Sequence, residues 1–125
     1  MSILSLEYLF IGVGAALGGI LRVALGKLFL TPIYGIVTPI LLINVLGCFI
    51  MGIITALSVM LPDNLRLFII PGFLGGFTTF SSFALEFGLL YEKNLHYPAF
   101  IYASLTILLS ILSFFIGLKL MRLLL

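Results

Sequence analysis

The chain has 125 residues, of which 63% are hydrophobic and only 8% are charged, and its formal net charge is +2. Soluble domains carry about 25% charged residues, so this composition and a mean hydropathy of +1.41 predict an all-α integral membrane protein and exclude a hidden soluble domain. The net charge is too small to suggest a nucleic-acid partner. A spanning helix needs about 20 apolar residues, so residues 1–125 fit one domain of four transmembrane helices with short loops.

Four apolar segments follow one another, at about residues 3–28, 37–61, 65–91 and 99–121. No Lys or Arg precedes the first segment, so we interpret it as a permanent span rather than as a cleaved signal peptide. The connections are "TPIYG", "PDN" and "EKNLHYP". Because these connections are short, neighbouring helices are expected to be antiparallel. The single cysteine, Cys48, lies in an apolar run and is predicted to be a packing residue.

The basic residues divide equally between the two sides of such a bundle. Those on the side of the termini are Arg66, Lys119 and Arg122, and those on the other side are Arg22, Lys27 and Lys93. A difference in Lys and Arg between the sides sets membrane orientation, and here there is no difference. Three explanations remain open: insertion in both orientations with pairing of inverted copies, orientation by a partner, and chance. A solute pathway would favour an oligomer, because side chains fill the centre of a four-helix bundle.

In the first segment, Gly14, Gly18 and Arg22 recur every four residues in "GVGAALGGILR" and share one helix face. Small residues let helices approach closely in lipid, so this face could pack against another copy or form a packing ridge within the chain. Arg22 also has two interpretations. Its side chain could extend to the membrane interface, or it could place a cation at the mouth of a polar cavity and concentrate anions there.

In the second segment, Asn44 lies in the middle of the apolar run "ILLINVLGCFIMG". A buried carboxamide in hydrocarbon must find hydrogen-bond partners or cost several kcal/mol. One interpretation is a hydrogen bond between helices that stabilises the fold. The other is a pair of N–H donors directed at a passing anion.

The third segment contains a helix-breaking stretch in its middle. Pro71 lacks an N–H group, Gly75 and Gly76 give the backbone freedom, and Thr78 and Thr79 are poor helix formers. We therefore expect the third helix to be broken near its middle, with a simple kink as the alternative. Discontinuous helices in membranes use freed carbonyl groups to hold a cation, so a monovalent cation is expected at this point.

Two stripes of side chains follow this stretch. One consists of Thr79, Ser82 and Glu86, and the other of Phe80, Phe83 and Phe87. The hydroxyls could bond back to the preceding turn, and the rings could contact lipid or fill a core. Glu86 is the only carboxylate well inside a span, and an ionisable residue within the membrane is by default a functional hypothesis.

The fourth segment has a matching hydroxyl face, made of Tyr102, Thr106, Ser110 and Ser113. We predict that the polar faces of the third and fourth helices line one narrow polar track. The sequence has no cluster of metal-ligating residues, and its single histidine, His96, is expected in the loop "EKNLHYP". No Ser/His/Asp set occurs within the spans, so we predict that the protein is not an enzyme.

Three motifs together resemble those of the CrcB/Fluc family of fluoride channels, and the resemblance covers nearly the full chain. "GAALGGILR" is similar to the family's first-helix motif, which ends in Arg22, and "INVLGCFIMG" is similar to the second-helix motif that carries Asn44. "GFLGGFTTFSSFALE" resembles the third-helix signature. This last match is highly specific, because its core G-G-x-[ST]-T-F-S-[ST]-F is matched from Gly75 to Phe83.

The resemblance implies a multi-pass protein of the bacterial inner, or plasma, membrane that forms an antiparallel, dual-topology homodimer. That assembly fits the equal division of basic residues. Each dimer of the family has two pores that export fluoride passively and lower its cytoplasmic concentration. The implied partners are fluoride ion, a second copy of the chain and the lipid bilayer, with no nucleic acid.

The resemblance also implies site residues. Phe80 and Phe83 would turn ring edges, which carry the positive end of the quadrupole, toward the anion, and Asn44 would donate N–H groups. The third helices would cross at the dimer centre and hold a structural Na+ through the carbonyls of Gly75 and Thr78. The rest of the implied fluoride pathway consists of Arg22, Thr79, Ser81, Ser82, Glu86, Thr106 and Ser110.

Two further hypotheses remain beside the fluoride channel. A small multidrug-resistance-type exporter, which is proton-coupled, is also a dual-topology dimer of four-helix chains, but it needs a carboxylate in its first helix. Glu7 is the only candidate there, and it lies close to the membrane interface. A non-transporting assembly subunit would leave the polar stripes unexplained.

Overall fold

The structure, a computed structural model, describes residues 2–28 and 38–125. Its helices are α1 (Ile3–Leu28), α2 (Pro39–Leu57), α3 (Asp63–Leu67), α4 (Gly75–Phe77), α5 (Phe80–Glu92) and α6 (His96–Leu124). A 3-10 turn, η1 (Ser58–Met60), follows α2, and the π-helical η2 (Phe68–Leu74) joins α3 to α4. No strand occurs within the described ranges, which confirms the prediction of an all-α protein.

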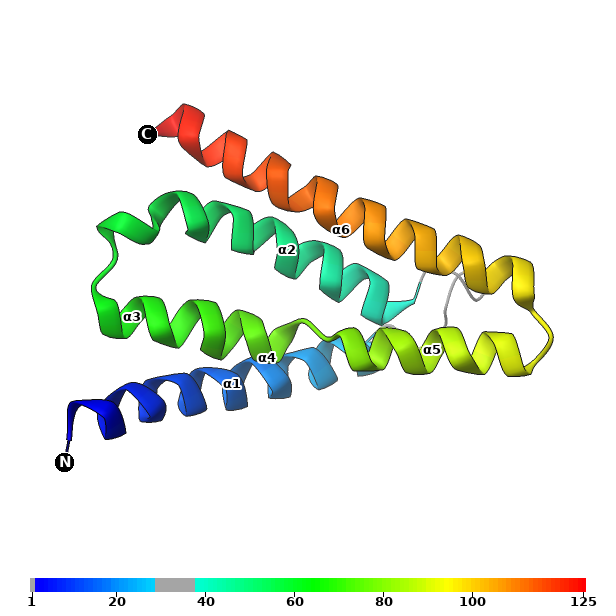
Figure 1. Cartoon of the computed structure of the whole chain (residues 1–125), viewed down its shortest axis with the longest axis horizontal. Helices are drawn as coiled ribbons and strands as arrows, with labels where there is room; N and C mark the ends of the chain where they lie inside the picture. Colours follow the sequence, from blue (N-terminus) through cyan, green and yellow to red (C-terminus); the bar gives the residue numbers. More distant parts are fainter. Residues whose placement is uncertain (1, 29–37) are drawn as a thin grey trace.

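The described residues contain four helical stretches that are long and apolar enough to cross a membrane: Leu4–Leu28, Pro39–Met60, Asp63–Glu92 and His96–Leu124. This confirms the prediction of four spanning helices in a multi-pass membrane protein. The helices lie side by side and alternate in direction, and the two termini lie at the same end of the bundle (Figure 1). The predicted loop "TPIYG" lies outside the described residues.

The start of α2 and the start of α5 are both capped by a threonine hydroxyl. Thr38 accepts a hydrogen bond from the backbone N–H of Leu41 at 3.1 Å, and Pro39 follows it at the first helical position, where proline is favoured. Thr79 accepts from the backbone N–H of Ser82 at 3.2 Å. Such caps satisfy N–H groups that have no partner within the helix.

Two extended residues separate α4 from α5 within the third span. Thr78 has φ −83° and ψ 153°, and Thr79 has φ −153° and ψ 120°. The non-helical stretch is visible between the two helices in Figure 1. Pro71 lies in the wider turns of η2, at a point where a proline removes an α-helical hydrogen bond and disturbs a regular α-helix.

Glycines bring α1 into backbone contact with the third span. A Cβ atom on Gly14 would lie 2.3 Å from the carbonyl oxygen of Phe68, and one on Gly18 would lie 2.0 Å from that of Phe73. From the other side, a Cβ on Gly76 would lie 2.4 Å from the carbonyl oxygen of Ala15. Of the two interpretations of this glycine face, the structure therefore supports the packing ridge within the chain.

A second close contact joins α2 to α6. A Cβ on Gly52 would lie 2.0 Å from the carbonyl oxygen of Phe114, and one on Gly117 would lie 2.2 Å from that of Phe49. The Ser113 hydroxyl donates to the carbonyl oxygen of Val45 at 2.9 Å and ties the two helices together.

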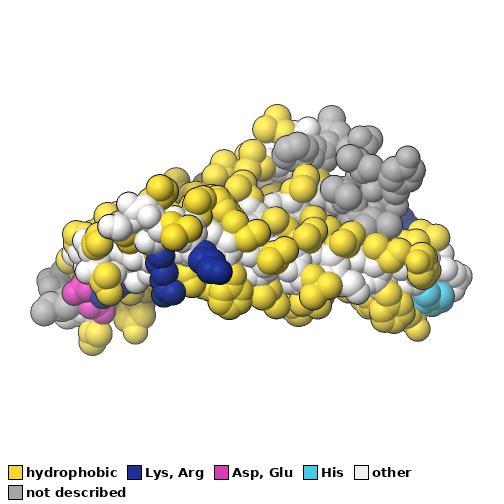
Figure 2. Space-filling model, turned by 90° about the horizontal axis from the view of Figure 1, so that it is seen from above, with side chains coloured by type: hydrophobic (Ala, Val, Ile, Leu, Met, Phe, Trp, Pro, Cys, Tyr) yellow, Lys and Arg dark blue, Asp and Glu magenta, His cyan; other side chains and the backbone are white. Residues whose placement is uncertain are grey.

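A small core lies at the other end of this helix pair, where α5 joins it. Its buried members are Leu41, Phe83 and Tyr102. Outside this core, large hydrophobic side chains are exposed along the helices, as expected for a surface in lipid. Figure 2 shows hydrophobic side chains over most of one face, with acidic side chains near one end and the histidine at the other.

Candidate functional site

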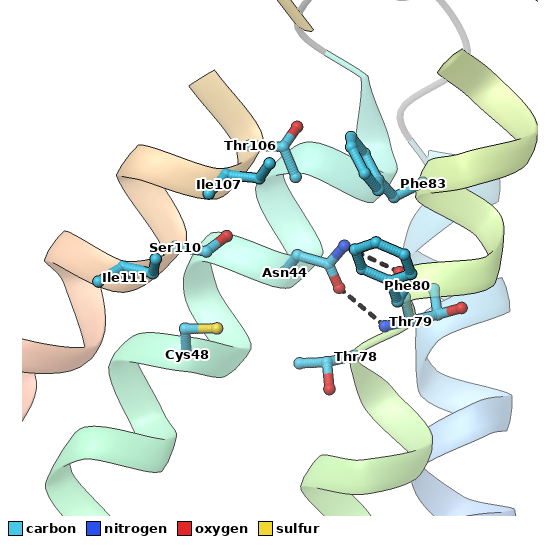
Figure 3. Close-up of a pocket in the computed structure, with 10 residues that line it drawn as sticks. All are labelled: Asn44, Cys48, Thr78, Thr79, Phe80, Phe83, Thr106, Ile107, Ser110 and Ile111. Carbon is cyan, nitrogen blue, oxygen red and sulfur yellow. Dashed lines mark hydrogen bonds between the residues drawn. The ribbon is translucent and has the colours of Figure 1, made fainter. Parts of the chain in front are cut away.

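A pocket of about 290 Å³ lies where α2, α5 and α6 meet beside the extended residues of the third span (Figure 3). Its wall combines an amide, hydroxyls, a thiol, aromatic rings and aliphatic side chains. The lining residues are Asn44, Cys48, Thr78, Thr79, Phe80, Phe83, Thr106, Ile107, Ser110 and Ile111. None of these residues is charged. The pocket thus brings together residues from the second, third and fourth apolar segments, which lie far apart in the sequence.

Asn44 pairs with both backbone groups of Thr79. Its Nδ2 donates to the Thr79 carbonyl oxygen at 3.0 Å, and its Oδ1 accepts from the Thr79 N–H at 2.8 Å, as the dashed lines of Figure 3 mark. The carboxamide therefore satisfies the backbone where helical hydrogen bonding stops. A carboxamide nitrogen has two N–H groups, so one donor remains for the pocket. The structure supports the interpretation of Asn44 as a bond between helices, and its second N–H group has no partner among residues 2–28 and 38–125.

Two hydroxyls of α6 that line the pocket lack partners. The side-chain oxygens of Thr106 and Ser110 are buried and accept or donate no hydrogen bond within the described residues. Thr106 is only 5% exposed. An unsatisfied buried polar group costs about 1–3 kcal/mol, so these hydroxyls are suited to a ligand or water that enters the pocket.

The predicted hydroxyl face of the fourth helix lies against the rest of the bundle. Tyr102, Thr106 and Ser113 are buried, and Ser110 is half-buried. Only part of this face lines the pocket, because Ser113 is held by the carbonyl oxygen of Val45 and Tyr102 points to another polar cluster.

Two phenylalanines of α5 border the pocket in different environments. The ring centroids of Phe80 and Phe83 are 5.2 Å apart, with an angle of 57° between their planes. Phe83 is 7% exposed and also packs against Tyr102, with 5.4 Å between the ring centroids. Phe80 is 75% exposed. One ring is thus a wall of the core, and the other extends to the outer surface of the chain.

The hydroxyls at the start of α5 form a local cluster. The Thr79 hydroxyl lies 3.1 Å from the Ser81 hydroxyl and donates to the Ser82 hydroxyl at 3.3 Å. This cluster surrounds the N-terminus of a helix, where the backbone carries a partial positive charge that favours anions. Ser81 and Ser82 lie outside the wall of the pocket, whereas Thr79 is part of it.

Glu86 lies one turn farther along α5 and is held by two hydroxyls. The Thr38 hydroxyl donates to its Oε2 at 2.8 Å, and the Tyr102 hydroxyl donates to the same oxygen. Glu86 thereby connects α5 to the start of α2 and to α6, outside the wall of the pocket. Thr38 was not predicted as a partner of Glu86, although a threonine followed by proline before an apolar run is a signal for a helix start.

Arg22 makes a bond that neither sequence interpretation anticipated. Its Nε donates to the carbonyl oxygen of Gly76 at 3.2 Å. That carbonyl lies in the last turn of α4, where a helix end carries a partial negative charge. Arg22 therefore stabilises the end of α4, and it does not line the pocket.

The carbonyl groups of Gly75 and Thr78 are suited to a cation. The Thr79 N–H, which would continue helical bonding to Gly75, donates to Asn44 instead. The Ser82 N–H, which would bond to Thr78, donates to the Thr79 hydroxyl. Carbonyl oxygens are ligands of hard cations. In the described ranges no group of three His, Cys, Asp or Glu side chains could hold a metal, so a cation there would depend on backbone oxygens.

Replacement of Tyr102 by phenylalanine is expected to lower the stability of the protein by about 1.5–3 kcal/mol, because it removes a hydrogen bond to a carboxylate. Reversible unfolding in mixed detergent micelles, followed by circular dichroism, measures this change. Tyr97→Phe on the same helix is the matched control, since Tyr97 is 78% exposed. Equal stability of the two variants would contradict a structural role for the Tyr102–Glu86 bond.

Four helices long and apolar enough to cross a membrane, with an uncharged pocket where α2, α5 and α6 meet, define a small multi-pass membrane protein. The model of the family described as CrcB-like protein, Camphor Resistance (CrcB), matches residues 9–118. The chain belongs to this family.

Several curated relatives are similar over most of their length. The chain is 38% identical to the fluoride-specific ion channel FluC of Rhizobium etli, over 94% of this chain and 97% of the relative. It is 39% identical to FluC of Granulibacter bethesdensis, over 94% and 95% of the two chains. It is 35% identical to FluC 1 of Staphylococcus aureus, over 92% and 96%.

Proposed function

We propose that this protein is a fluoride-selective channel that exports fluoride passively and lowers its cytoplasmic concentration. The observation that carries this proposal is the uncharged pocket, in which the unpaired hydroxyls of Thr106 and Ser110 lie opposite Asn44 and the phenylalanine pair. The names of relatives that match nearly the whole chain support the same function.

The lining is chemically suited to a small anion. Fluoride must give up strong hydrogen bonds to water, and hydroxyl and amide donors can replace them. The edges of the Phe80 and Phe83 rings add a weak positive potential. Because no lining residue is charged, the anion would not be trapped, and conduction requires binding weak enough for release.

Several predicted residues would act beside the pocket rather than in its wall. We assign Ser81 and Ser82 to a hydroxyl track at the start of α5, where the helix end favours an anion, and Thr79 of the pocket wall joins this track to the pocket. Glu86 would orient the hydroxyls of Thr38 and Tyr102 along this track. Arg22 would act on the pathway indirectly, because its side chain holds the carbonyl group of Gly76 in place.

The assembly that we propose is an antiparallel, dual-topology homodimer with two pores. The exposed ring of Phe80 supports it, because a pocket residue that is 75% exposed needs a further surface to complete the wall. The equal numbers of basic residues on the two sides also support it.

We further propose that Thr78 and Thr79 form a functional break in the third helix and that Na+ binds beside it. The carbonyl oxygens of Gly75 and Thr78 would hold the ion, with equivalent groups from a second copy. The positive charge of a bound Na+ would balance the partial negative charge of the carbonyl oxygens at the helix ends.

The direct experiment reconstitutes the purified protein in liposomes loaded with potassium fluoride or potassium chloride. Efflux is started with a potassium ionophore and followed with ion-selective electrodes, with protein-free liposomes as the control. We expect rapid fluoride efflux and little chloride efflux. Absence of fluoride efflux, or equal efflux of the two anions, would overturn the proposal. Proton-driven release of an organic cation dye would favour the exporter hypothesis instead.

Phe80→Leu is expected to slow fluoride efflux by about fivefold, because an aromatic contact contributes about 1 kcal/mol and about 1.4 kcal/mol is a factor of ten in rate. Phe80 is largely exposed in the chain, so this variant should still fold. Phe100→Leu is the control, since Phe100 is also an exposed phenylalanine but does not line the pocket. Wild-type efflux through Phe80→Leu would remove this ring from the mechanism.

A further inference from the structure

The single cysteine of the chain lies in the wall of the pocket. Cys48 is half-buried and follows Asn44 by one turn of α2, so the two side chains share a helix face. Figure 3 shows its sulfur atom on the side of α2 that carries the Asn44 side chain, directed toward Thr78. The prediction that Cys48 only fills space between helices does not account for this position.

The same pocket has a second feature that indicates a ligand. Thr106 is 95% buried, from an exposed fraction of 5%, yet its hydroxyl oxygen has no partner within the described residues. The hydroxyl of Ser110, which also lines the pocket, is unpaired as well. A species small enough to reach these hydroxyls therefore also reaches the Cys48 thiol.

We propose that Cys48 is a modification site for small soft metal electrophiles of the alkylmercury class, and that its modification closes the anion passage. A thiol sulfur is a soft ligand that selects such metals. In the reaction with methylmercury chloride, the S–H bond breaks and an S–Hg bond forms. Chloride leaves the metal and the proton leaves to water, with no change in oxidation state.

The position of the methylmercury adduct explains why it is expected to block the anion passage. A methylmercury group on Cys48 would extend into the pocket on the side of Thr78 and would present an apolar methyl group there. Hydrophobic constrictions close ion pathways by excluding water. The predicted loss of fluoride efflux rests on the proposed function, whereas the predicted labelling of the Cys48 thiol does not depend on it.

The experiment treats liposomes that contain the full-length protein with methylmercury chloride. Adduct formation is measured by intact mass spectrometry and fluoride efflux by electrode in the same sample. We expect one adduct per chain and a fall in efflux by about tenfold or more, reversed by excess dithiothreitol. The Cys48→Ser variant, compared with its own untreated rate, should show neither adduct nor inhibition.

A relocated cysteine distinguishes blockage from labelling alone. The double variant Cys48→Ser, Ile116→Cys places the thiol on a half-exposed position of α6 outside the pocket. We expect it to form the adduct without losing efflux. A wild-type protein that is fully labelled but conducts normally, or that fails to label, would overturn the proposal. Absence of efflux before treatment would instead contradict the proposed function, while the adduct still reports whether Cys48 is reachable.

Discussion

Asn44→Leu is expected to lower fluoride efflux by about 100-fold or more and to destabilise the fold, because unpaired backbone groups in a membrane are costly. The substitution removes the partners of both the N–H and the carbonyl group of Thr79. At about 1–3 kcal/mol for each unsatisfied group, the expected loss of stability is about 2–6 kcal/mol. Efflux from liposomes and unfolding in mixed micelles measure the two effects.

Two comparison variants sharpen this prediction. Asn44→Asp keeps an oxygen for the Thr79 N–H but removes the donor to the Thr79 carbonyl, so its stability should lie between those of the wild type and Asn44→Leu. Asn64→Leu makes the same exchange at an exposed position of α3 and should change stability by about 0.5 kcal/mol or less. If Asn44→Leu kept wild-type stability and efflux, the Asn44–Thr79 pair would contribute neither to the stability of the fold nor to transport.

Gly18→Val is expected to destabilise the protein by about 3 kcal/mol or more, because overpacking of a filled site forces the backbone to move. A Cβ at this position would lie 2.0 Å from the carbonyl oxygen of Phe73 and 2.9 Å from the backbone nitrogen of Phe77. Both contacts are backbone atoms and cannot turn aside as a side chain could. We expect α1 to separate from η2 and α4, with a loss of monodisperse protein in detergent and a lower unfolding midpoint.

The matched control is Gly12 on the same helix, where a Cβ would meet no atom within 4 Å. Gly12→Ala should be neutral or stabilising by about 0.5–1 kcal/mol, because alanine is the better helix former. A similar loss of stability in Gly12→Ala and Gly18→Val would show that α1 tolerates no glycine replacement, and the close contact would not be the cause.

The helices themselves could be predicted from the sequence, whereas the contacts between them could not. Long apolar runs predicted the four spans, because only helices or closed barrels satisfy the backbone in lipid. The spacing of Tyr102, Thr106 and Ser113 predicted their common face, because residues three or four apart on a helix are neighbours. Both predictions depend on local periodicity.

The bonds between helices depend on tertiary packing, which periodicity does not contain. Asn44 meets Thr79 across 35 positions, Thr38 meets Glu86 across 48, and Arg22 meets Gly76 across 54. Most of these residues stand out in the sequence as polar groups in an apolar chain, but their hydrogen-bond partners could not be predicted from it. Thr38 and Cys48 received no site role, because a capping threonine and a lone cysteine have common structural explanations.

The two glycine contacts divide the fold into two tightly joined helix pairs. Backbone touches backbone between α1 and the first half of the third span, and again between α2 and α6. The pocket lies where the α2–α6 pair meets Thr78, Thr79 and the start of α5, and the Asn44–Thr79 hydrogen bonds cross this seam. The shape of the pocket therefore depends on these directional bonds as well as on the packing of Phe83 in the core. We expect substitutions at the seam to change the pocket while the two glycine contacts hold their helices together.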